Sequence, residues 1–100
     1  MNTYLDTYLK NYTKEVSELN LDTINRSTQI LDASNQSSNA MQVAVLLALM
    51  KDIQHKYLDS INEIHDRYLK SLSAIVSSTE NISLKEAEKY VSEILKINLI

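Results

Sequence analysis

Hydrophobic side chains recur every three or four residues along most of the chain. In the first part the apolar positions are Tyr4, Leu5, Tyr8, Leu9, Tyr12, Val16 and Leu19. This spacing places them on one face of an amphipathic helix and predicts a helix over residues 3–19. Apolar residues are sparser over residues 22–33, where we expect a second, weak helix. Asn20 or Asp22 could end the first helix and begin the second.

A polar segment, DASNQSSN, occupies residues 32–39. Its small polar side chains favour caps and turns, so we expect a turn there. Beyond it, apolar positions step by three or four and predict one long helix over about residues 38–77. These positions are Val43, Leu46, Met50, Ile53, Tyr57, Ile61, Ile64, Tyr68, Leu72 and Ile75.

Part of the long helix nearly repeats itself, since YLDSI at residues 57–61 returns as YLKSL at residues 68–72. A period of eleven residues corresponds to about three helical turns, so the stripe stays on one face of a nearly straight helix. The repeat therefore indicates packing against other helices and needs no functional explanation.

A terminal helix is predicted over residues 84–97. Ser83 and Glu86 have the spacing of a capping box at its start. The last four residues, 97–100, are largely apolar, and we expect them to dock onto the rest of the chain. The predicted fold is all-α, an antiparallel bundle of three to four helices around the long helix, forming a single domain over residues 1–100.

Composition narrows the possible functions. The chain has no Gly, Pro or Cys, and its ten basic and thirteen acidic residues give a net charge of −3. Without Cys there is no thiol nucleophile, and without a basic stripe nucleic-acid binding is disfavoured. The longest apolar stretch, residues 40–50, falls short of the roughly 20 residues that span a bilayer. We expect a soluble, cytoplasmic protein without a Sec-type signal peptide, although secretion by another route stays open.

Candidate catalytic and metal-binding residues are few. Asp52 and His55 have half the spacing of a carboxylate-histidine metal motif, but His55 points away from the apolar stripe and lies among charged residues. No Ser or Thr has a histidine partner on the buried face. We therefore expect no enzymatic activity, no cofactor and no metal site.

The stretch AMQVAVLLALM, residues 40–50, is apolar around the whole helix. Met41, Val45, Ala48 and Leu49 lie opposite the buried stripe. A helix that is apolar all round must be surrounded. Either the first helix and the weak helix after it together wrap this stretch, or part of the stretch meets another chain, and we favour another chain.

Three tyrosines, Tyr4, Tyr8 and Tyr12, form a ladder one turn apart near the start of the chain. Tyrosine suits both the rim of a core and a protein interface, because its ring is apolar and its hydroxyl reaches water. We count these three with Met41, Val45, Ala48 and Leu49 as candidate interface residues.

The sequence therefore predicts a small, non-catalytic interaction or assembly protein that self-associates or holds a partner helix through the apolar stretch. One alternative is a partner-binding chaperone or inhibitor of the secretion-system or phage type. A second alternative is a nucleic-acid regulator that acts as a helical dimer, which would bind with a steep dependence on salt.

Overall fold

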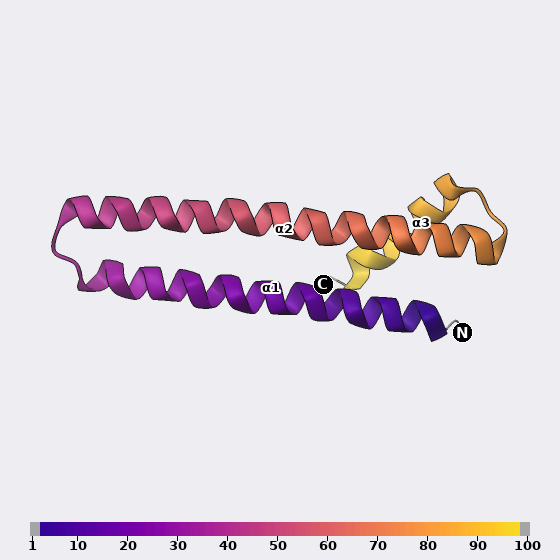
Figure 1. Cartoon of the computed structure of the whole chain (residues 1–100), viewed down its shortest axis with the longest axis horizontal. Coiled ribbons are helices and arrows are strands. Elements are labelled where there is room, and N and C mark those ends of the chain that lie inside the picture. Colours follow the sequence, from indigo (N-terminus) through magenta and orange to yellow (C-terminus); the bar gives the residue numbers. More distant parts are fainter. Residues whose placement is uncertain (1–2, 99–100) are drawn as a thin grey trace. The chain divides into compact units, whose positions relative to one another are not determined.

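Three α-helices make up the computed structural model, which describes the backbone of residues 3–98 and the side chains of residues 4–96. Helix α1 spans Thr3–Gln36, α2 spans Ala40–Glu80 and α3 spans Leu84–Asn98 (Figure 1). No strand occurs within the described backbone. The all-α prediction is confirmed. The predicted docking of residues 97–100 concerns side chains outside those described.

The break predicted near Asn20 or Asp22 is absent, because α1 continues without interruption to Gln36. Each residue expected to cap a helix has a side-chain partner instead. Asn20 accepts a hydrogen bond from the Tyr57 hydroxyl over 2.6 Å, and Asp22 pairs with Arg26 one turn later at 3.1 Å. Asn and Asp cost a helix interior only a few tenths of a kcal/mol, so such contacts suffice to keep the helix continuous.

The turn between α1 and α2 consists of residues 37–39, shorter than the predicted polar turn. Asn39 caps α2, because its side-chain oxygen accepts the backbone N–H of Met41 over 2.8 Å and of Gln42 over 3.4 Å. Ser37 donates its hydroxyl to the Gln42 side chain over 2.8 Å. The polar residues of this segment therefore act as caps, which fixes where α2 begins.

The second turn joins α2 to α3. Asn81 adopts a left-handed conformation with φ of 55°, which asparagine tolerates better than most residues. Ser77 secures the turn by donating its hydroxyl to the carbonyl of Ile82 over 2.7 Å. Ser83 then caps α3, since its hydroxyl accepts the backbone N–H of Glu86 over 3.2 Å. The predicted cap at Ser83 is confirmed.

The chain divides into two compact units. Residues 3–16 and 62–98 form what we call the three-helix unit, and Ser17–Ile61 form the hairpin unit. The unit boundaries fall inside α1 and inside α2, so each unit contains a part of both long helices. Helix α3 belongs to the three-helix unit only.

The three-helix unit has a well-defined hydrophobic core. Its helices α1 and α2 run antiparallel, since Glu15 contacts Arg67 whereas Tyr4 shares a surface hollow with Val76. Three residues of α3 are completely buried against them. The buried apolar side chains are Tyr12, Val16, Ile64, Tyr68, Leu72, Val76, Ala87, Val91 and Leu95.

The hairpin unit has no core of this kind, because none of its residues is buried. Its two helices touch along a seam of half-buried positions. The α2 side of this seam is mostly apolar, with Val43, Leu46, Met50, Ile53, Tyr57 and Ile61. The α1 side is mostly small and polar, with Leu19, Asn20, Thr23, Ser27, Ile30, Ser34 and Ser37. Two helices with such a seam bury little apolar surface, so the hairpin gains little hydrophobic stabilisation.

Candidate interaction site

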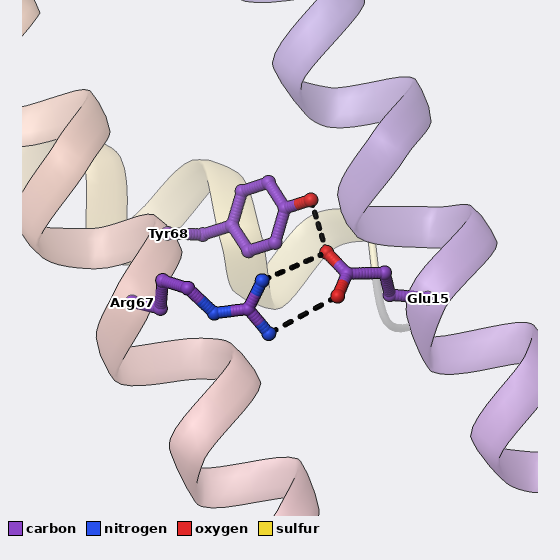
Figure 2. Close-up of polar contacts among 3 residues, drawn as sticks. All are labelled: Glu15, Arg67 and Tyr68. Carbon is purple, nitrogen blue, oxygen red and sulfur yellow. Dashed lines mark hydrogen bonds and ion pairs between the residues drawn. The ribbon is translucent and has the colours of Figure 1, made fainter.

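A cluster of three polar side chains joins α1 to α2 in the three-helix unit (Figure 2). The guanidinium of Arg67 binds the carboxylate of Glu15 with both terminal nitrogens, at 3.0 Å to Oε1 and 3.4 Å to Oε2. The hydroxyl of Tyr68 donates to the same carboxylate. The three side chains bond one another across the two helices, so the cluster fixes α1 against α2.

The cluster shifts two pKa values. The hydrogen bond from Tyr68 lowers the pKa of Glu15, and Arg67 acts in the same direction against the opposing effect of burial. Burial raises the pKa of Tyr68 to about 12, and the neighbouring Glu15 carboxylate adds to this rise. Glu15 is therefore ionised and Tyr68 neutral at physiological pH.

We expect Glu15→Gln to lower the free energy of unfolding by about 1 kcal/mol at pH 7, because it removes a charged acceptor of hydrogen bonds from a partly exposed site. The pKa of Glu15 is lower in the folded chain than its ordinary 4.5. Its stabilising contribution is therefore present above that value and is lost as the pH falls through the folded pKa. Urea unfolding of both proteins at pH 7 and in acid should show the difference shrinking in acid. An equal difference at both pH values would contradict this origin.

The predicted tyrosine ladder lies mostly inside the chain. Tyr12 is completely buried and packs edge-on against Tyr68 at a ring-centroid distance of 5.2 Å, and Tyr8 packs against the same ring at 6.4 Å. Burial raises the pKa of Tyr12. Tyr4 is half-buried and lines a hollow with Tyr90. The sequence left open whether these tyrosines belong to the core or to an interface. Tyr12 lies in the core, and Tyr8 belongs to the same aromatic cluster.

The predicted interface residues of α2 lie at the surface of the hairpin unit. Met41, Val45 and Leu49 are exposed to 78%, 57% and 48%, and Ala48 is exposed as well. The first helix therefore does not wrap this stretch within the chain. An interface through these residues stays a prediction.

One side of the hairpin, which we call the charged face, carries two ion pairs. Arg26 pairs with Asp22 at 3.1 Å on α1, and Lys56 pairs with Asp52 at 2.9 Å on α2. These four side chains line a shallow hollow together with Asp59 and Leu49. Both pairs have the acid-before-base spacing of four residues that stabilises a helix.

The other side, which we call the uncharged face, consists of Ile24 and Leu31 of α1 and Leu47 and Leu58 of α2, with Leu21 at its edge. Counting about 100° per residue, the first four lie roughly 60–100° from the centre of the seam, on the same side of the hairpin. All five are more than half exposed. Sequence reasoning missed this face because residues 22–33 were treated only as a weak helix. The spacing of Leu21, Ile24 and Leu31 was the available signal.

Both histidines lie on α2. His55 is exposed, and His65 lies 3.9 Å from the carboxylate of Asp66. Across the described residues, no three His, Cys, Asp or Glu side chains come together in a group suited to a metal ion.

None of the helices, over their described residues, is both long enough and apolar enough to cross a membrane. No protein-family model, no curated protein and no solved structure matches this chain.

Proposed function

We propose that this chain is a non-catalytic interaction protein whose hairpin unit acquires its hydrophobic core by packing against another polypeptide. One observation carries the proposal. Among the side chains that the structure describes, every buried one lies in the three-helix unit, whereas the hairpin unit has none and carries eight of the ten exposed large apolar residues. The exposed residues of the hairpin are Leu21, Ile24, Leu31, Met41, Val45, Leu47, Leu49 and Leu58.

Such a hairpin has a physical reason to bind a partner. Helices in water depend on tertiary packing for most of their stability, and exposed apolar patches of this extent mark interaction surfaces. A covering helix or pair of helices packed on one side of the hairpin would bury several of these residues and complete a bundle of three or four helices. The apolar stretch at residues 40–50 would form part of that contact.

The charged groups of the hairpin support a protein partner over a nucleic acid. Two of its three basic residues, Arg26 and Lys56, already pair with carboxylates of their own helix. Phosphate binding draws on a concentrated set of cations, and neutralised cations contribute little to it. A chaperone or inhibitor remains a form of the same proposal, since it would use the same surface.

Hydrogen exchange tests the proposal. In the dilute, purified chain we expect amides of Ser17–Ile61 to exchange at least tenfold faster than the slowest amides around Leu72, because the hairpin opens at low cost. In the chain recovered from its native host under mild conditions, the hairpin amides should be protected. A dilute monomer whose hairpin exchanges as slowly as the three-helix unit would show that the hairpin needs no partner, and the proposal would fail.

A further inference from the structure

The two sides of the hairpin differ in the number of charged residues that they carry, and this difference favours one side as a contact surface. The charged face bears Asp22, Arg26, Asp52 and Lys56 in two ion pairs. The uncharged face has no acidic residue, and its α1 part has no charge at all: at the intervening positions it carries Thr28 and Asn35. On α2 its single charged residue is Lys51, at the outer edge.

We infer that the uncharged face is the contact between two copies of this chain, which pair their hairpins into a four-helix bundle. The inference rests on the proposed function and adds to it the identity of the partner and the side that it covers. In a two-fold dimer the same patch meets itself, and a mainly apolar face that carries one lysine at its outer edge places few charges against its copy.

The apolar residues of this face are distributed as a helix-pair contact requires. In the hairpin, Asn20 hydrogen-bonds Tyr57 and Ser37 hydrogen-bonds Gln42. Because the two helices run antiparallel, residues at the same height along the hairpin have numbers that sum to about 78. Leu21 is then level with Leu58, and Leu31 is level with Leu47. Two cross-helix pairs of leucines thus lie toward opposite ends of the hairpin, with Ile24 between them.

The dimensions of the face also suit a dimer. The twenty residues of α1 in the hairpin extend about 30 Å, and two helices side by side are about 20 Å wide. The face therefore offers roughly 600 Å² of flat area per copy, or about 1,200 Å² in total, which reaches the range of stable interfaces. The charged face would remain in water, where its charged side chains are solvated.

The dimer is tested with two substitutions on the same helix, Leu47→Glu and Leu49→Glu. The two leucines are similarly exposed in the single chain, 56% and 48%, but lie on opposite faces of the hairpin. Sedimentation velocity over a wide concentration range should give the full chain a mass of twice 11.4 kDa that falls on dilution. Leu47→Glu should raise the dissociation constant by about 100-fold or more, because it buries a carboxylate, and Leu49→Glu by less than about tenfold.

Two further measurements make the result unambiguous. Slow hydrogen exchange of residues 64–76 in both variants would show that the three-helix unit is still folded, and Ile24→Glu should weaken association from the other helix as Leu47→Glu does. A wild-type chain that stays at 11.4 kDa at every concentration would overturn the dimer. So would equal weakening by Leu49→Glu. If such a monomer exchanges its hairpin amides rapidly, the partner is not a second copy, but the proposed need for a partner stands. If the monomer protects its hairpin amides fully, the proposed function fails as well.

Discussion

Leu72→Ala is expected to lower the free energy of unfolding of the three-helix unit by about 2–5 kcal/mol, because the side chain is completely buried and its removal leaves a cavity. A chain of this length has a total stability of roughly 5–15 kcal/mol, so the loss is a large fraction of it. Urea unfolding followed by circular dichroism measures the change.

Leu84→Ala is the matched control. It makes the same chemical change in the same unit, but Leu84 is 52% exposed on the first turn of α3. We expect it to cost less than about 1 kcal/mol. Equal losses from the two substitutions would mean that the core does not surround Leu72 as the structure shows.

The positions of the helices could be predicted from the sequence because local signals determine them. Apolar spacing of three and four residues predicted the long helix, and the Ser83 cap predicted where α3 begins. The missing break at Asn20 shows the limit of such signals. Asn20 has a weak preference for helix ends, and a hydrogen bond from Tyr57, 37 residues away, outweighs it.

The extent of burial along α2 could not be predicted in the same way. The apolar stripe has one period throughout, yet Leu72 is fully buried whereas Leu46 and Ile53 are only half-buried. The difference comes from α3, which belongs to one unit alone, and from the small polar residues that α1 places opposite the other part of the stripe. Neither fact is contained in the sequence of α2.

The pairing of Arg67 was also beyond the sequence rules. Spacing of four residues predicts Glu63 as its partner. In the structure Arg67 binds Glu15 of α1 with two nitrogens, in a cluster that Tyr68 completes. A bidentate contact between helices replaces a local pair, and only the packing of α1 on α2 reveals it. The exposed leucines that form the uncharged face were missed for a similar reason, since each helix supplies only half of the face.

Val91→Asp should unfold the three-helix unit in the full-length chain. Val91 lies in the middle of α3 and is completely buried, with Ala87 and Leu95 one turn to either side. A carboxylate there would lose its hydration without gaining a partner, at a cost of about 3–5 kcal/mol or more. That cost approaches the whole stability of a small domain, so we expect weak, gradual thermal unfolding by circular dichroism in place of a cooperative transition.

Tyr90→Asp is the matched control for Val91→Asp. It adds the same charge to α3 without placing that charge in the buried contact between α3 and the other two helices. Tyr90 is the neighbouring residue and is 53% exposed, so its replacement leaves the new carboxylate in water. We expect a cooperative transition with a loss of about 1 kcal/mol or less. If Val91→Asp also keeps a cooperative transition close to that of the wild type, α3 does not complete the core. The contrast between a unit with a core and a hairpin without one would then lose its physical basis, because α3 is the element that distinguishes them.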